Sequence, residues 1–382
     1  MTNIALFLFS LAPFFDPVGQ NFGIRWISMI FMIFLFLNVG VLRKKLQFYQ
    51  IFIFLFLILI MPAHGLLISF IKGGVITNDF KDTSYIAFSF LFLISIPIIL
   101  NKNFYFKFYK NILNISLLAC LLSFFLYFGL KTEGVSNYLT ERSIAIIAER
   151  GILGINFKMI YFLAAPLFFI PLAYFLNKSS ENKLNLLIAL LPLLALIATG
   201  TRSHIILGIL YFAWMIPNIF IKPSQAINIF IFKGLLATFC IILSVFYLNY
   251  DLVYEIIEAP KRNALLIFYA DTFNEINTFL FGQGFNSISW DYDLIAWTEG
   301  ASKLELTYFE YIRVFGIISF IIFVMIYFYI FISLSKAQNY TELHFLLLSM
   351  VNAFVNPYLF SINGIVPLIL ALGRLNQNAK RQ

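Results

Sequence analysis

The sequence predicts an all-α polytopic membrane protein, and three observations lead to this fold class. Of the 382 residues, 61% are hydrophobic and only 12% are charged, whereas soluble domains carry about 25% charged residues. The apolar residues form continuous runs, unlike the short alternating runs of a membrane β-barrel. Backbone groups in lipid must be paired within their own segment, so each run is expected to be helical.

Twelve apolar runs are the candidate helices. In chain order they are residues 3–15, 24–42, 48–71, 85–100, 112–128, 157–176, 184–199, 204–221, 227–247, 304–334, 343–360 and 362–375. The first, the fourth and the last are shorter than the roughly 20 residues that a full span requires. We therefore predict about 10 to 12 transmembrane helices.

The runs divide the chain into three parts. Residues 1–247 are expected to form transmembrane helices with short loops, residues 248–303 one large loop, and residues 304–382 the C-terminal transmembrane helices. The large loop is the longest interval without a membrane-length apolar run, and acidic, basic and aromatic residues crowd there. We expect the chemistry where this loop meets the membrane.

The distribution of Lys and Arg predicts the orientation. If the N-terminus is cytoplasmic and all runs cross, the cytoplasmic connections receive the basic segments 43–45 and 101–110, and of all acids only Glu181 and Glu342. This agrees with the positive-inside rule. Both termini are then cytoplasmic and the loop 248–303 is periplasmic. The net charge of +8 is spread over separate turns, so it does not indicate nucleic-acid binding.

Several cations remain on the outer face, and Arg202 is the most informative. It lies in the segment 199–204, Thr-Gly-Thr-Arg-Ser-His, between two apolar runs. With Ser203 as the cap of the following helix, backbone N–H groups and a guanidinium would form an anion site. Because Arg binds phosphate in bidentate fashion, a diphosphate is the natural ligand. The alternative is an interfacial arginine that reaches lipid headgroups.

Arg150 is the second outer cation of interest. It lies in the segment 149–158, whose glycines predict a turn before the next run. A salt bridge with Glu149 or Glu141 is the alternative interpretation. Arg142 and Arg262 have the same alternative, because an arginine near acidic residues is usually paired.

Other motifs carry less. Residues 291–293, Asp-Tyr-Asp, match the carboxylate pattern by which metal-dependent sugar-nucleotide enzymes hold Mn²⁺ or Mg²⁺. Nucleotide sugars are cytoplasmic, however, and this loop is predicted to be outside. The three histidines are far apart. Asp16 is expected to cap or hydrate its turn. We predict no metal and no cofactor, and we find no dinucleotide or P-loop motif.

Four segments together indicate a family. Residues 199–203 look like a Ser-Arg or Thr-Arg element before a span, and residues 150–156 like an Arg-x-x-Gly-x-x-Asn element. Residues 281–285 look like a glycine-rich turn within a large loop, and residues 305–316 like the segment that closes such a loop. With its many spans and its loop in the C-terminal third, the chain resembles the O-antigen ligase/polymerase superfamily of bacterial inner-membrane enzymes, the Wzy and WaaL proteins.

One departure bears on the subclass. Ligases of this superfamily usually carry a His–Asn pair 11 residues before the closing glycine, which is Gly316 here. The position holds Glu305, followed by Leu306, and the segment 248–303 has no histidine. The resemblance is therefore closer to an O-antigen polymerase of the Wzy type than to a ligase.

The resemblance implies a metal-independent, inverting glycosyltransferase with a GT-C-like architecture. Its substrates would be oligosaccharide repeat units on undecaprenyl diphosphate, joined at the periplasmic face of the inner membrane without a nucleotide. Its partners would be these lipid-linked units, membrane lipid and a chain-length regulator. The alternatives are a ligase of the same superfamily and a flippase or exporter of lipid-linked oligosaccharide.

The resemblance also implies roles for particular residues. Arg202 and Arg150 are expected to stabilise the departing diphosphate, and Glu305 to be the base for the acceptor hydroxyl. The expected substrate-binding residues are Lys158, Arg262, Tyr308, Arg313 and Arg142. If Glu305 begins a helix, Tyr308 and Arg313 share its face. Arg313 then pairs with an acid or reaches phosphate.

Overall fold

The computed structural model describes residues 2–16, 23–38, 46–72, 83–128, 133–142, 144–152, 155–220, 259–285, 306–354 and 359–379. This part of the chain is mostly helical, as the sequence predicts. Three of its helices, Phe48–Ile71, Lys102–Tyr127 and Thr307–Lys336, are long and apolar enough to cross a membrane. Shorter apolar helices accompany them.

Apart from the start of α6, the N-terminal elements follow the predicted runs closely. They are α1 (Thr2–Phe15), α2 (Ile24–Asn38), α3 (Phe48–Leu55), a π-helical turn (Phe56–Ile60), α4 (Met61–Ile71), α5 (Thr83–Leu100) and α6 (Lys102–Phe128). Asp16 accepts a hydrogen bond at 3.0 Å from the Arg25 backbone N–H in the first turn of α2. It therefore caps that helix, as the sequence predicts.

The predicted start of α6 was wrong by about three turns. The apolar run begins at residue 112, but the helix begins at Lys102 and includes the basic segment before the run. Asn101 explains the early start, because its side-chain oxygen accepts a hydrogen bond from the Asn103 backbone N–H at 3.0 Å. A side-chain oxygen at this place satisfies one of the unpaired N–H groups at the helix start.

The central segment contains the largest departure from the all-helical expectation. After α7 (Glu133–Glu141) the chain forms β1 (Ala145–Ile152) and β2 (Ile155–Phe162), which pair antiparallel in a two-stranded sheet. The predicted helix over residues 157–176 is therefore wrong in its first part. A short 3₁₀ helix (Ala165–Phe168) with Pro166 in its first turn follows, and then α8 (Phe169–Lys178).

The remaining elements complete the helical bundle. They are α9 (Leu184–Ala198), α10 (Arg202–Phe220), α13 (Ala259–Asn274), α14 (Ile276–Phe281), α16 (Thr307–Lys336), α17 (Tyr340–Ala353) and α18 (Ile362–Ala379). The predicted run 227–247 lies outside the described residues. Within the predicted large loop, the structure describes residues 259–285, which comprise α13, α14 and the turn after α14.

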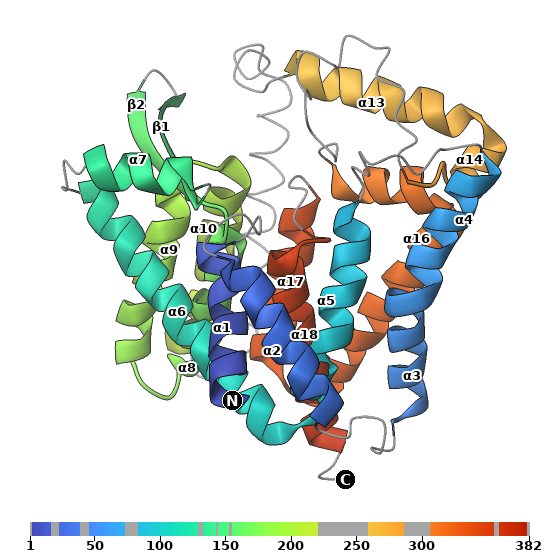
Figure 1. Ribbon diagram of the computed structural model, residues 1–382. Helices are drawn as coiled ribbons and strands as arrows, with labels where there is room; N and C mark the ends of the chain where they lie inside the picture. The colour runs from blue at the N-terminus through green and yellow to red at the C-terminus, as the bar shows by residue number, and fades with distance from the viewer. Residues whose placement is uncertain are drawn as a thin grey trace.

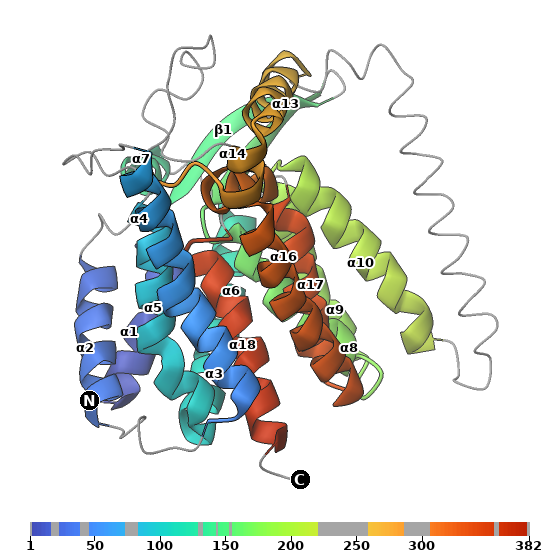
Figure 2. The same cartoon turned by 90° about the vertical axis from the view of Figure 1, so that its right-hand side faces the viewer.

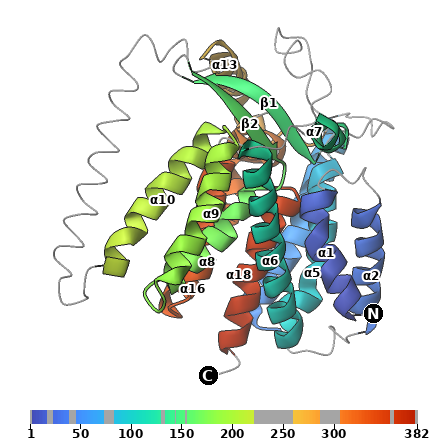
Figure 3. The same ribbon diagram turned by 90° about the vertical axis from the view of Figure 1, so that its left-hand side faces the viewer.

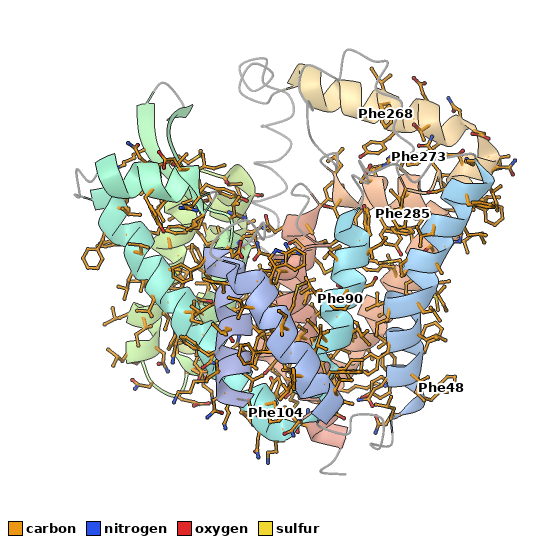
Figure 4. The ribbon with its side chains drawn as sticks, viewed as in Figure 1. Phe48, Phe90, Phe104, Phe268, Phe273 and Phe285 are labelled. Atoms are coloured by element: carbon orange, nitrogen blue, oxygen red, sulfur yellow. The ribbon has the colours of Figure 1, made fainter. Side chains whose placement is uncertain are left out.

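Helix α18 forms the centre of the bundle. Every residue from Ile362 to Gly373 is buried, and the helix packs against α5, α6 and α17 (Figure 3). The outer helices expose large apolar side chains instead. Phe48 on α3 is 85% exposed (Figure 4) and Phe70 on α4 is 79% exposed. An apolar outer surface of this extent suits contact with lipid rather than with water.

The bundle has two distinct ends. Helix α1 begins and α18 ends at one end, at the bottom of Figure 1, which we call the terminus end. The β1–β2 hairpin, α13 and α14 lie at the opposite end, which we call the loop end. The residues predicted to bind substrate that the structure describes lie on elements at the loop end.

Candidate functional site

The turn between α9 and α10 carries Arg202, and its own residues hold its shape. Gly200 has a φ of 63°, which favours glycine. The Thr199 hydroxyl donates to the Leu196 carbonyl oxygen at 2.6 Å and accepts from the Thr201 backbone N–H at 3.2 Å. Helix α10 begins at Arg202, so Ser203 lies in its first turn. The prediction that Ser203 is the helix cap was therefore wrong.

His204 anchors this turn to the hairpin. Its ring is fully buried, stacks on the Tyr161 ring at 5.7 Å and meets the Phe169 ring edge-on at 6.0 Å. Its Nδ1 lies 3.3 Å from the Thr199 hydroxyl oxygen. A Cβ at Gly200 would lie 2.7 Å from Cγ of Met159, the neighbour of Lys158. The start of α10 is thus packed directly against β2.

The strand register fixes which face of the hairpin carries position 150. Arg150 pairs with Phe157, and Ala148 pairs with Met159. Residues two apart in a strand lie on the same face of the sheet, and directly paired residues share a face. Position 150 therefore lies on the hairpin face that carries Met159, which contacts the α9–α10 turn. We call the meeting of this face with the start of α10 the hairpin corner.

Lys158 lies on the opposite face of the hairpin. Its ammonium donates a hydrogen bond to the Leu126 carbonyl oxygen at 3.1 Å, near the end of α6. Carbonyls in the last turn of a helix lack helical partners, and lysine side chains stabilise them. Lys158 thus ties the hairpin to α6.

The other predicted cations occupy separate positions. Arg142 follows α7, is exposed, and holds its guanidinium 5.9 Å from the Tyr138 ring centroid. Arg262 lies in α13. Glu305, the predicted base, lies outside the described residues, directly before Leu306 in the sequence.

A second group of residues surrounds the bend in α16. The helix begins at Thr307 after Leu306, whose φ is 66°, and it is broken at Gly316, whose φ is 77°. Figures 1 and 2 show the first part, residues 307–315, lying across the loop end and the second part descending through the bundle. We call residues 307–315 the surface half of α16.

Arg313 and Glu310 form a buried ion pair on the surface half. The Arg313 Nε and Nη2 atoms each lie 2.7 Å from a different oxygen of Glu310. The two side chains are 0% and 2% exposed. Arg313 Nη1 also donates to the Gln283 side-chain oxygen at 3.3 Å. The sequence left open whether Arg313 pairs with an acid or reaches phosphate, and the acid is the partner observed.

The bend at Gly316 leaves carbonyl groups without helical partners, and the turn after α14 satisfies them. The Gln283 backbone N–H donates to the Arg313 carbonyl at 2.7 Å, and the Gly284 N–H donates to the Val314 carbonyl at 3.0 Å. His64 Nε2, on α4, lies 3.1 Å from the Phe315 carbonyl and 2.9 Å from the Phe281 carbonyl. Both partners are acceptors, so this nitrogen carries the hydrogen.

Glycines make this close approach sterically feasible. A Cβ at Gly282 would lie 2.3 Å from the Val314 carbonyl oxygen, and one at Gly316 would lie 2.2 Å from the Leu280 carbonyl oxygen. At Gly284 it would lie 2.4 Å from the Ser69 backbone nitrogen. The glycine-rich turn at residues 281–285 therefore serves as the cap of a broken helix.

Helix α13 lies over the surface half of α16. Tyr269 donates its hydroxyl to Glu310 at 3.2 Å and packs its ring 5.6 Å from the Phe309 ring. Phe268 and Phe273 of α13 join the same aromatic cluster (Figure 4). Burial, followed by the neighbouring Glu310 carboxylate, raises the pKa of Tyr269 well above its ordinary value. The phenol therefore stays protonated and remains a hydrogen-bond donor.

Tyr308, a predicted substrate-binding residue, faces the bundle. Its hydroxyl donates to the Met350 carbonyl oxygen, and its ring packs 5.8 Å from the Phe354 ring. Both contacts join the surface half of α16 to the end of α17.

The start of α18 lies between the hairpin and the surface half of α16. Asn363 donates from its side chain to the Leu163 carbonyl at 2.7 Å, directly after β2. Phe360 stacks on Tyr311 of α16 at 5.3 Å. The segment 359–363 therefore contacts both the end of the hairpin and the surface half of α16.

Sequence reasoning missed the contacts of three residues that shape this end. His64 contacts carbonyl groups far away in the chain, and His204 packs against rings of other elements. Glu310 pairs locally with Arg313, but its burial and its contact with Tyr269 depend on α13. Among the described residues, no group of three or more His, Cys, Asp or Glu side chains gathers as metal ligands would. Comparisons with protein-family models, with curated proteins and with solved structures find no match to this chain.

Proposed function

We propose that the protein is a multi-pass membrane glycosyltransferase that polymerises oligosaccharide repeat units carried on undecaprenyl diphosphate. In this proposal it has a GT-C-like architecture and lies in the bacterial inner membrane. The loop end faces the periplasm and the termini face the cytoplasm. The reaction transfers the growing glycan from its diphosphate to a hydroxyl of the next lipid-linked unit, with inversion at the anomeric carbon and without a metal.

One observation supports the proposal: two separate basic motifs lie on adjoining elements, the start of α10 and the hairpin, at the end of the bundle that also carries α13 and α14. The α9–α10 turn supplies Arg202 at the start of a helix, and the strand register puts Arg150 on the adjoining face. A helix N-terminus with guanidinium groups beside it favours a doubly charged ligand. Lipid-linked diphosphate is such a ligand, and its lipid chain keeps it at the membrane surface.

The proposed chemistry assigns separate tasks to the charged residues. Arg202 and Arg150 stabilise the negative charge that develops on the departing diphosphate. Lys158, Arg142 and Arg262 add positive potential along the approach, and Tyr308 and Arg313 support the acceptor side. Glu305 removes the proton from the acceptor hydroxyl as the new bond forms. The bond that breaks is already activated, so no nucleotide is required.

Deletion of the gene in the source bacterium tests the proposal. We expect single repeat units on the surface lipid in place of a polymer ladder, and restoration of the ladder by the wild-type chain. Complementation with Arg202→Ala or Arg150→Ala should leave single units, while immunoblots show normal amounts of protein in the membrane. A normal ladder in the deletion strain would exclude the polymerase function.

The phenotype of the deletion strain distinguishes a polymerase from a ligase and from a flippase. Loss of a ligase leaves finished polymer that is attached only to its lipid carrier, whereas loss of a polymerase leaves single units attached to the surface lipid. Loss of a flippase leaves the lipid-linked units on the cytoplasmic side, where periplasmic enzymes cannot reach them. Finished polymer attached only to its lipid carrier would identify the protein as a ligase. Lipid-linked units that stay on the cytoplasmic side would identify it as a flippase.

A further inference from the structure

The ion pair between Glu310 and Arg313 has an unusual setting. Two full charges lie together at 0% and 2% exposure on one turn of a helix that is broken three residues later. Burying charges is unfavourable unless the geometry is good and the remaining polar atoms are satisfied. Gln283 and Tyr269 provide that satisfaction from outside the helix. The pair is therefore the point at which α13, the α14 turn and α16 are joined.

Each residue of this pair contacts a different element: Arg313 contacts the turn after α14, and Glu310 contacts α13. Gln283 binds Arg313 twice, through its side chain and through its backbone N–H on the Arg313 carbonyl. Tyr269 binds Glu310 and packs beside Leu306, which is 7% exposed. Loss of the pair would release α13 from one side and the start of α16 from the other. Leu306 directly follows Glu305, the proposed base, in the sequence.

We propose that Glu310, Arg313 and Gln283 are positioning residues that hold the surface half of α16 beneath α13 and so fix the geometry of the acceptor side. In this inference, which rests on the proposed function, Arg313 does not contact the diphosphate, because its guanidinium is used by Glu310 and Gln283. The three residues act through Leu306, which directly precedes α16.

The first experiment measures the position of Leu306 without any enzymatic assay. The full chain carries Leu306→Cys with Cys120→Ala and Cys240→Ala, and it is held in lipid nanodiscs. The rate of reaction with a membrane-impermeant maleimide is then measured. Adding Glu310→Gln or Tyr269→Phe should raise this rate by about tenfold or more, since local opening exposes buried groups. Tyr269→Phe removes a single hydroxyl, so it keeps the test valid if Glu310→Gln does not accumulate.

The chain offers a matched control for this experiment. Lys178 and Glu181 form a pair with the same three-residue spacing and the same 2.7 Å separation, but they are exposed at the terminus end. Glu181→Gln should leave the labelling rate of Leu306→Cys unchanged. If Glu310→Gln and Tyr269→Phe leave it unchanged as well, the positioning role is overturned.

The second experiment asks what the pair does for the reaction. With lipid-linked repeat units as substrate, Glu310→Gln and Arg313→Lys should lower kcat by up to about 100-fold, because small displacements of reacting groups are costly. The KM for the donor should not change. A raised KM with an unchanged kcat would instead identify Arg313 as a phosphate ligand. If the wild-type chain forms no polymer, the proposed function fails, and the labelling rates still decide whether the pair positions Leu306.

Discussion

Arg202 is the single residue on which the proposed chemistry depends most. It is the first residue of α10, and the turn before it is fixed by Thr199, by the positive φ of Gly200 and by packing on Met159. In the proposed reaction, a backbone fixed in this way places residue 202 with little reorganisation when charge develops on a leaving diphosphate. Electrostatic groups that are held in place in this way contribute more than mobile ones.

Replacement of Arg202 should therefore affect the chemical step directly. We expect Arg202→Ala to lower the rate of polymer formation by about 100- to 1,000-fold, and Arg202→Lys to recover only a small part, because lysine lacks the bidentate fork. The initial rate with lipid-linked units in nanodiscs measures this effect. Lys183→Ala, at the terminus end, is the control. A wild-type rate in Arg202→Ala would remove this residue from the site.

His204 supports the same turn through packing, and its substitution separates support from chemistry. We expect His204→Ala to lower the free energy of unfolding by about 2–4 kcal/mol, because a fully buried ring is removed. His204→Phe should retain most of the stability by stacking on Tyr161 and Phe169. Thermal unfolding of the purified protein measures the difference. Equal losses for both variants would show that hydrogen bonding, not ring packing, is the main contribution.

At the scale of an element, the broken helix α16 depends on glycine. Its bend at Gly316 and the turn at Gly282 bring two backbones into direct contact, at distances where a Cβ would overlap a carbonyl oxygen. The broken helix exposes carbonyl groups, and three donors from two other elements satisfy them. Such a junction is stable only while every partner is present.

We expect Gly316→Ala to destabilise the protein by about 2–4 kcal/mol. The added methyl group would overlap backbone atoms of α14, and the positive φ of residue 316 is unfavourable for alanine. Gly208→Ala is a suitable control. Gly208 lies within α10, its φ is not positive, and an added Cβ would meet only leucine side chains at 3.3 Å or more. Thermal unfolding in detergent or nanodiscs compares the two variants. Similar unfolding temperatures would show that the bend tolerates a side chain.

The hairpin shows what a local pattern leaves undetermined. Residues 157–176 are apolar enough to be a helix, and α8 does form in the second half. In the first half, antiparallel pairing with residues 145–152 satisfies the backbone instead. That pairing depends on a partner strand and on contacts with α6 and α9, none of which an apolar run contains. The continuous helices at 48–71 and 184–198 had no such competitor, and there the prediction was confirmed.

The site could be anticipated only in part, for a related reason. The spacing of Glu310 and Arg313 is compatible with pairing on one helix, and this was one of the two alternatives left open for Arg313. That the pair would be fully buried depends on α13 and on Gln283, which contact it from other elements. His64 and His204 likewise acquire their roles from distant carbonyls and rings. The proposed tasks of Arg150, Arg202 and Glu305 remain predictions.

At the scale of the whole molecule, the two ends differ in what their charged residues do. At the terminus end, Glu342 is buried beside Arg374 at 3.6 Å and accepts a hydrogen bond from the Tyr105 hydroxyl at 3.1 Å. These contacts join α6, α17 and α18. At the loop end, charged residues lie on the hairpin, on α10, on α13 and on the surface half of α16. One end is thus tied together by a buried charge, and the other combines the buried Glu310–Arg313 pair with the exposed cations Lys158 and Arg142.

The basic connections at the terminus end predict that the loop end is the one accessible from outside the cell. We place a single cysteine at Glu275, exposed between α13 and α14, or at Glu181, exposed between α8 and α9, in a background with Cys120→Ala and Cys240→Ala. A membrane-impermeant maleimide that passes the outer membrane should label Glu275→Cys in intact cells. It should label Glu181→Cys only after the inner membrane is opened, because the basic connections favour the cytoplasm.

Each alternative arrangement leaves its own labelling pattern. Labelling of Glu181→Cys alone in intact cells would invert the orientation and move the hairpin corner to the cytoplasm, where lipid-linked polymer would not be its substrate. Labelling of both positions would mean that the bundle does not separate two compartments, and the membrane-spanning arrangement would then be wrong. Labelling of Glu275→Cys alone leaves the hairpin corner facing the periplasm, where a lipid-linked donor and acceptor can meet.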